Sequence, residues 1–233
     1  MIFHFQTLNT KYYKLKAKKL NSGMTYVEVL TVLAIFSIMT SIVLFNYRDF
    51  QAKVDIKNLA SDIALKVVEA QKASLDGKLP PPAQNLLISD PLTWKPSYGV
   101  YFDTTPPLLQ KQLIYFTDLD NTSPPQNSSF DSPGSSCAGT DECLDKITIT
   151  KNNYIHSIDN CNDITCSSPT SICSLSIVFK RPDYMAIFTG KICNSPTDGI
   201  ITTTSHIQIN IASPNLIATA KIKIYPSGRI QVN

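Results

Sequence analysis

A long apolar run near the N-terminus is the strongest pattern in this chain. From Met24 to Phe45, 22 residues follow one another with a single charged side chain, Glu28. A helix of that length is sufficient to cross the hydrocarbon core of a bilayer, which is about 30 Å thick. The run therefore predicts a transmembrane helix. A carboxylate inside such a helix is costly unless another group pairs with it.

Beyond the apolar run the pattern becomes amphipathic. No Gly or Pro occurs between Met24 and Asp76, so nothing local ends the helix before residue 76. Apolar side chains recur on one face at helical spacing: Ala52, Ile56, Leu59, Ala60, Ile63, Val67 and Ala70. Gly77 is predicted to cap the helix, and the prolines at 80–82 prevent its continuation. The second half, residues 46–76, is expected to pack against a folded head.

After a proline-rich connector at residues 77–97, the hydrophobic period changes to two. Seven segments rich in Ile, Val, Tyr, Phe and Thr are predicted to be strands: 98–102, 112–117, 146–150, 175–180, 184–189, 206–211 and 218–225. Turn residues at 226–229 close a terminal hairpin. The chain is thus predicted to be an α+β protein. One long N-terminal helix, transmembrane then amphipathic, packs on an antiparallel β-sheet or β-sandwich head that spans residues 98–233.

Charge is distributed unevenly around the apolar run. Residues 1–22 contain five lysines and no acidic residue. Such a segment favours the cytoplasmic side, which leaves the chain after Phe45 outside. An ordinary secretory signal has an apolar core of only about 7–15 residues, followed by a small-residue cleavage site. Here the small residue, Gly23, stands before the run instead.

This basic leader, the glycine, the segment Met-Thr-Tyr-Val-Glu and the apolar helix together resemble the prepilin leader of type IV pilins and type II secretion pseudopilins. The resemblance implies cleavage between Gly23 and Met24 by a membrane-embedded prepilin peptidase, which also methylates the new N-terminus. It makes Glu28 the fifth mature residue, which in that family pairs with the N-terminal amine of a neighbouring subunit. Met24 and Tyr26 stand where Phe and Leu are commonest.

Loss of such a leader changes the charge of the working protein. The whole chain has 21 basic and 18 acidic residues, and removal of the five leader lysines leaves 16 basic residues against 18 acidic ones. The net charge therefore changes from +3 to −2. A nearly neutral chain gives no support for nucleic-acid binding.

The resemblance implies a structural subunit of a type IV pilus or a type II secretion-like filament, assembled through its N-terminal helix. It implies a single-pass inner-membrane protein with its head outside the cytoplasm, which then enters a cell-surface or periplasmic filament. The implied partners are other pilin or pseudopilin subunits, the prepilin peptidase, an inner-membrane assembly platform with its ATPase, and membrane lipid. No cofactor is expected. The order of the elements, and a mature length of 210, are most like a minor pilin or minor pseudopilin.

Two other interpretations stay open. In one, the chain is an uncleaved single-pass membrane protein whose extracytoplasmic β domain binds a ligand or DNA. In the other, the chain is a pilin whose head is an adhesin or a DNA-uptake receptor. Lys221, Lys223 and Arg229 form the local basic cluster that such a receptor would use, although a solvent-facing strand edge also explains them.

All six cysteines fall within one 57-residue window of the head: Cys137, Cys143, Cys161, Cys166, Cys173 and Cys193. An even count in an exported domain predicts three disulfides. We favour the local pairs 137–143 and 161–166. The pair 173–193 would join the arms of a hairpin that turns near residues 181–183, in which opposed positions sum to 366. Other pairings are formally possible, whereas zinc is disfavoured because neither Cys-x2-Cys nor close Cys/His pairs occur.

The segment 118–122 has the alternating oxygen ligands with which calcium loops begin, so Asp118 and Asp120 are calcium candidates, with Asp131 as a late ligand. Ser123 and Ser129 stand where such a loop has its glycine and its acid, which favours an ordinary solvated loop. No metal site is therefore predicted.

Nothing in the sequence points to catalysis. No nucleophile elbow, Cys/His signature or phosphate-binding loop accompanies the three histidines, His4, His156 and His206. The single Trp94 is expected to pack at the junction of helix and sheet. The protein is predicted not to be an enzyme.

Overall fold

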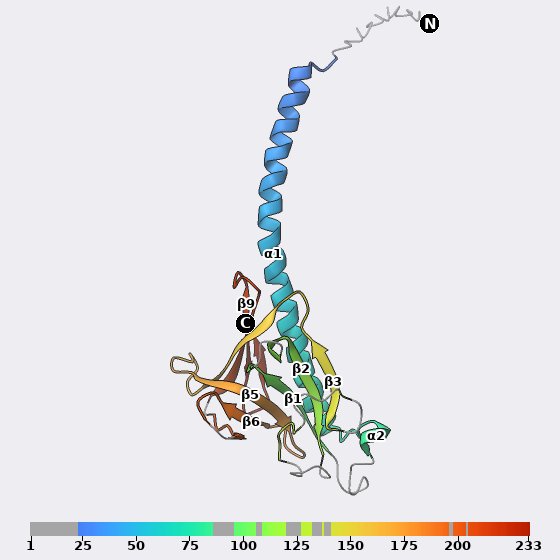
Figure 1. The fold of residues 1–233 in the computed structure, drawn as a ribbon, viewed down its shortest axis with the longest axis vertical. Coiled ribbons are helices and arrows are strands. Elements are labelled where there is room, and N and C mark those ends of the chain that lie inside the picture. Colours follow the sequence, from blue (N-terminus) through green and yellow to red (C-terminus); the bar gives the residue numbers. More distant parts are fainter. Residues whose placement is uncertain are drawn as a thin grey trace, which may run out of the picture. The chain divides into compact units, whose positions relative to one another are not determined.

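A computed structural model describes residues 23–85, 96–105, 109–119, 127–131, 137, 141–195, 198–203 and 205–233. The chain forms two compact units, Met1–Phe45 and Asn46–Asn233, and each is considered by itself (Figure 1). The helices are α1 (Tyr26–Leu75), α2 (Pro82–Asn85) and the 3-10 turn η1 (Leu109–Lys111). Residues 86–95 of the proline-rich connector, with Trp94, lie outside the described residues.

Helix α1 ends at Leu75 in a Schellman motif. The Lys78 amide donates to the Ala73 carbonyl at 3.0 Å, and the Gly77 amide donates to the Ser74 carbonyl at 3.1 Å. Gly77 has a φ of 59°, a left-handed conformation that glycine adopts without a Cβ penalty. The cap predicted at Gly77 is therefore confirmed.

Within the described residues, ten strands form one antiparallel sheet, in which the strand order is β10-β9-β8-β4-β5-β1-β2-β3 and β6 and β7 branch from β5. The strands are β1 (Ser97–Asp103), β2 (Gln112–Asp118), β3 (Cys143–Thr148), β4 (Tyr154–Cys161), β5 (Thr170–Phe179), β6 (Ala186–Ile192), β7 (Asp198–Ile200), β8 (His206–Ala212), β9 (Thr219–Ile224) and β10 (Ile230–Val232). The α+β fold is confirmed: a long N-terminal helix packs against a large curled antiparallel sheet.

The main core lies between the second half of α1 and one face of this sheet. Five residues of the predicted apolar stripe are buried there, with Ile56, Ala60, Ile63, Val67 and Ala70 each at most 1% exposed. The other two, Ala52 and Leu59, are partly buried against the same cluster. The small alanines let the helix approach the strands closely. The strands contribute alternate residues to the same cluster: Tyr98, Val100, Phe102, Leu113, Ile177 and Phe179.

A second, smaller core covers the opposite face of the central strands. It consists of the residues that alternate with the first set: Tyr101, Ile114, Phe116 and Val178, together with Phe130 and Cys143. The ring of Phe130 lies 5.2 Å from the rings of both Tyr101 and Phe116. Segment 127–131 therefore covers the face that α1 leaves open, and every residue of β1 is buried.

Gly99 is the point of closest packing within β1. A Cβ added there would lie 2.7 Å from the Ile177 carbonyl oxygen and 2.8 Å from two ring atoms of Phe116. Gly99→Ala is expected to lower the free energy of unfolding by about 1–3 kcal/mol, because the Ile177 carbonyl belongs to a paired strand and cannot move freely. Gly199→Ala, in β7, meets open space and should change stability by less than about 0.5 kcal/mol. Urea denaturation of both variants measures the difference, and equal stabilities would contradict the packing argument.

Several strand predictions need correction. The sequence analysis missed β4 and β7, and it placed β3 and β6 two to three residues away from their positions. It also began β5 at residue 175, five residues after its start at Thr170. A register shift between Ile155 and Ser157 breaks the apolar alternation in β4, which hid the period of two. β7 has only three residues, all exposed, and so carries no pattern.

The predicted register of the β5–β6 hairpin is wrong by one residue. Phe179 pairs with Ala186, and the positions paired from Ser174 to Phe179 sum to 365 rather than 366. The prediction extended the spacing of Cys173 and Cys193 along the whole hairpin. The structure has a register shift between Ile172 and Ser174, which separates the cysteine end from the rest. By contrast, the predicted terminal hairpin is present, and in it Ile230 pairs with Ile224.

Candidate functional site

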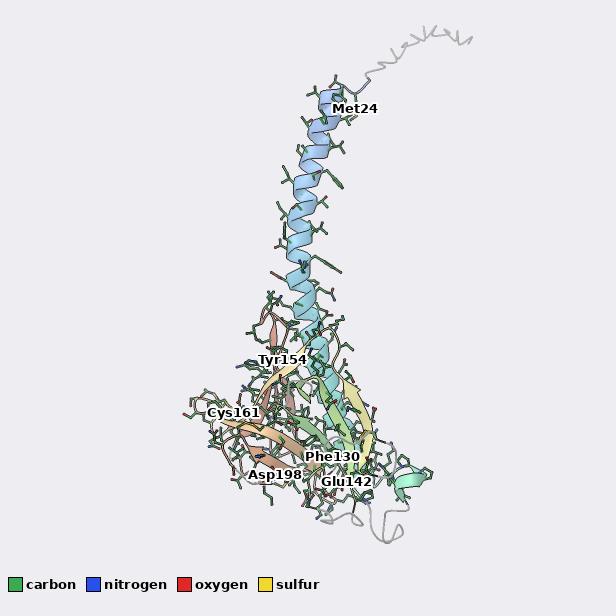
Figure 2. The ribbon with its side chains drawn as sticks, viewed as in Figure 1. Met24, Phe130, Glu142, Tyr154, Cys161 and Asp198 are labelled. Carbon is green, nitrogen blue, oxygen red and sulfur yellow. A yellow bond between two sulfur atoms is a disulfide. The ribbon has the colours of Figure 1, made fainter. Side chains whose placement is uncertain are left out.

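The candidate processing and assembly residues lie at the start of α1. Gly23, Met24 and Thr25 precede the first helical residue, Tyr26 (Figure 2). The Glu28 amide donates a hydrogen bond to the Thr25 Oγ1 at 3.3 Å, so Thr25 is the N-cap of the helix. Glu28 thus occupies the third helical position, as in a capping box. The sequence analysis did not identify the cap at Thr25, although the Thr-x-x-Glu spacing was a signal that could have found it.

The carboxylate of Glu28 is exposed and makes no hydrogen bond or ion pair with the described residues. It lies where the helix has unpaired amides and the positive end of its dipole. On a water-exposed helix this placement stabilises a carboxylate by about 0.3–1 kcal/mol. In hydrocarbon a carboxylate costs about 2.5–3.5 kcal/mol at the helix centre and less near an interface, so a cation beside Glu28 would offset a cost that the helix start only partly offsets.

The first half of α1 has an uncovered apolar surface. No residue from 23 to 50 is buried, and the large apolar side chains from Met24 to Phe45 are 40–78% exposed. Among the described residues, α1 is the one helix with the length and hydropathy to cross a membrane. An apolar surface this large is covered by lipid or protein in a working molecule.

Three hydroxyl groups along this segment bond to their own helix. Thr31 donates to the Glu28 carbonyl at 2.9 Å, Ser37 to the Leu33 carbonyl at 2.9 Å, and Thr40 to the Phe36 carbonyl at 2.8 Å. Such bonds satisfy a hydroxyl without water, which suits an apolar environment. The single helix with its β head is thus compatible with a single-pass membrane topology.

The head contains three disulfides, Cys137–Cys143, Cys161–Cys166 and Cys173–Cys193, and they are the pairs that the sequence analysis favoured. Each joins Cα atoms 4.8 Å apart. The first ties the chain before β3 to that strand, and the second closes the loop after β4. The third links β5 to the end of β6. All three are consistent with an oxidising compartment.

The calcium candidate Asp118 does not lie in a solvated loop, as the sequence interpretation had it. It is the last residue of β2, is 1% exposed, and accepts a hydrogen bond from the Ser128 amide at 3.0 Å. Asp120 lies outside the described residues. Nearby, Glu142 is fully buried and accepts hydrogen bonds from the amides of Leu119 and Asp131 at 3.1 and 3.0 Å. Two buried carboxyls therefore hold segment 127–131 onto the sheet, beside Phe130 (Figure 2).

Burial changes the acidity of both groups. Desolvation raises the pKa of Asp118 to about 7, against the opposing effect of the Ser128 amide. Desolvation likewise raises the pKa of Glu142 to about 7, and the negative charges of Asp131 and Asp118 add to the shift. The sequence analysis missed Glu142 because burial of a carboxylate has no local pattern. In the described part of the chain, no group of three or more His, Cys, Asp or Glu side chains could hold a metal ion.

The remaining sequence candidates do not converge on a site. His206 is buried in β8 against the ring of Tyr225, and desolvation lowers its pKa. His156 is exposed on β4, and His4 lies outside the described residues. In the candidate basic cluster, Lys223 donates to the Ile164 carbonyl at 3.2 Å and Arg229 stacks on Tyr225 at 3.9 Å. These contacts give the two cations local structural roles.

Comparisons with known proteins do not place the chain in a family. No family model matches it, and neither a curated protein nor a solved structure resembles it significantly.

Proposed function

We propose that this chain is a prepilin-like structural subunit of a type IV pilus or type II secretion-like filament. In this proposal the leader is removed after Gly23, and Met24 becomes the methylated N-terminus. The helix from Met24 to Phe45 then anchors the subunit in the membrane before assembly and joins a bundle of identical helices in the filament. The function is mechanical, with no chemistry performed by the chain itself.

The observation that carries the proposal is the single carboxylate on the uncovered apolar segment of α1. The other polar side chains with a described bond there are satisfied within the helix, whereas Glu28 stands at the helix start with no counter-ion among the described residues. A neighbouring N-terminal ammonium would supply that counter-ion, because cleavage after Gly23 creates one four residues away in sequence. Pairing offsets the desolvation of both groups.

The head supports the proposal in a general way. A disulfide-linked β domain that follows the membrane helix directly is suited to display outside the cytoplasm. The partners would be other subunits, the prepilin peptidase, and an assembly platform with its ATPase. Which of these filaments the subunit builds depends on those partners.

The proposal is tested by the mass and N-terminal sequence of the protein extracted from membranes, with the prepilin peptidase present and absent. A chain that begins at N-methylated Met24 is expected only when the peptidase is present. Gly23→Val should stay uncut in both cases, because a β-branched side chain replaces the smallest residue at the cleavage site. Retention of residues 1–23 by the unmodified chain in both cases would overturn the proposal.

The alternative is an uncleaved single-pass membrane protein whose head binds a ligand or DNA. The helix and the disulfides are compatible with it. No particular observation on the described residues of the head favours this alternative. The same cleavage experiment separates the two functions.

A further inference from the structure

Exposed apolar side chains and cations gather where the first turns of the head unit meet the loop between β8 and β9. We call this the base surface. It consists of Tyr47, Phe50, Lys53, Val54 and Lys57 on α1 and of Leu216 and Ile217 in the loop. Phe50, Lys53, Val54, Lys57 and Ile217 line one shallow hollow. In Figure 1 the red loop beside the β9 label lies along α1.

The loop presents its apolar residues to the outside. Leu216 and Ile217 are 55% and 50% exposed, and Phe50 on the adjoining helix is 63% exposed. Leu216 has a φ of 56°, a left-handed conformation that Gly or Asn adopts more easily than leucine. Neither the turn nor the core of the head therefore accounts for a leucine at this tip.

The base surface begins shortly after the membrane segment in sequence. Phe50 follows the end of the apolar run by five residues, which is about 7.5 Å along a helix. The headgroup layer on each side of a bilayer is about 5–7.5 Å thick. Because the β8–β9 loop lies against residues 50–57 of the same helix, it has access to the same depth.

The charge of the base surface fits an anionic headgroup layer. Lys53 and Lys57 line the hollow, and Arg48 lies one turn before them. The acidic groups on this part of α1 are Asp49, which is exposed, and Asp55, which pairs with Lys151 at 2.7 Å. The surface thus keeps a positive excess beside its apolar residues, and Tyr47 is a residue type that is enriched at membrane interfaces.

We propose that the base surface docks the head on the outer headgroup layer of an anionic phospholipid bilayer, with Leu216 and Ile217 inserted among the lipids. The inference rests on the proposed function, since it requires α1 to span the membrane before assembly. Docking would restrict the orientation of the head while the subunit waits in the bilayer. The contact would be broken when the subunit is withdrawn into a filament.

The test uses the full chain in vesicles of phosphatidylglycerol and phosphatidylethanolamine that contain lipids brominated near the headgroup. Ile217→Trp reports on the loop. Ile164→Trp is its matched control, because Ile164 is an exposed isoleucine beyond the opposite end of β4 and β8. Tyr154 and Cys161 mark those two ends in Figure 2. Quenching of Trp94 in the parent chain is subtracted from both.

We expect quenching at position 217 to be at least about twofold stronger than at position 164, since only an inserted residue approaches the bromine atoms. Lys53→Glu combined with Lys57→Glu should reduce the difference. Equal quenching at the two positions would overturn the inference. Burial of position 217 that is lost when the protein is diluted in lipid would also overturn it. In that case a second copy of the chain, and not lipid, would cover the loop.

A third variant separates this inference from the proposed function. Phe36→Trp, in the middle of the apolar run, should be quenched by lipids brominated deep in the acyl chain. If it is quenched and position 217 is not, the inference alone fails. If Phe36→Trp is not quenched, the membrane span fails, and the proposed function fails with it.

Discussion

Glu28→Gln is expected to lower incorporation of the subunit into filaments by at least about tenfold. Leaving one member of a buried ion pair without its partner costs about 3–5 kcal/mol. In the proposed assembly that unpaired group is the ammonium of Met24 on the neighbouring subunit. Cleavage after Gly23 and the thermal stability of the head should not change, because Glu28 is exposed and lies outside the head unit. Sheared filaments and the membrane fraction are compared by quantitative immunoblotting.

Two controls separate pairing from helix capping. Thr25→Ala removes the N-cap hydrogen bond to the Glu28 amide and should weaken the helix by only about 0.5–2 kcal/mol. Asp62→Asn removes an exposed carboxylate from the head part of the same helix and should leave assembly unchanged. If Thr25→Ala reduces assembly as much as Glu28→Gln, the carboxylate acts through the cap and the pairing hypothesis is wrong.

Asp118→Asn is expected to stabilise the head at pH 8 and to do so much less at pH 5. The pKa of Asp118 is about 7 in the folded chain and near 3.8 when unfolded, so the folded state binds more protons between these values. Stability therefore falls as the pH rises from about 4 to 7, by about 1.4 kcal/mol for each unit of pH. The amide keeps an oxygen for the Ser128 amide but carries no charge.

Thermal denaturation at the two pH values measures the effect. The gain in Tm from Asp118→Asn should be about 5–10 °C larger at pH 8 than at pH 5, since a head of this size shifts by about 2–4 °C per kcal/mol. His206, with its lowered pKa, acts in the opposite direction as the pH falls, but it is common to both proteins and cancels in the difference. Asp145→Asn, on the exposed part of β3, is the matched control. A gain in Tm that is independent of pH would show that folding does not raise the pKa of Asp118.

The calcium candidate shows where sequence reasoning reached its limit. The alternation of oxygen-bearing residues after Asp118 suggested an exposed loop. Asp118 is instead the last residue of β2, and its carboxyl group holds segment 127–131 over the second core. The distinction depends on Phe130 packing against Tyr101 and Phe116, which are 29 and 14 residues away in sequence. A pattern read over a few neighbouring residues cannot reveal contacts between residues so far apart.

The base surface illustrates the same limit in a different way. Leu216 and Ile217 stand before the strand predicted at 218–225, so the sequence pattern assigned them no role. Only the pairing of β8 with β9 turns them outward, beside residues of α1 that lie more than 150 positions earlier. Their meeting with Phe50 and Lys53 could not be derived from composition or period.

The sequence by itself determined the features that arise from neighbouring residues. These are the apolar length of the first half of α1, the buried stripe of its second half, the cap at Gly77, the α+β class and the favoured cysteine pairs. Each follows from local geometry, in which period, φ preference or short spacing decides the result. The tertiary structure alone decided the branched strand order, the register shifts, the burial of Asp118 and Glu142, and the base surface. Those depend on which distant segments exclude water together, and that is a property of the whole fold.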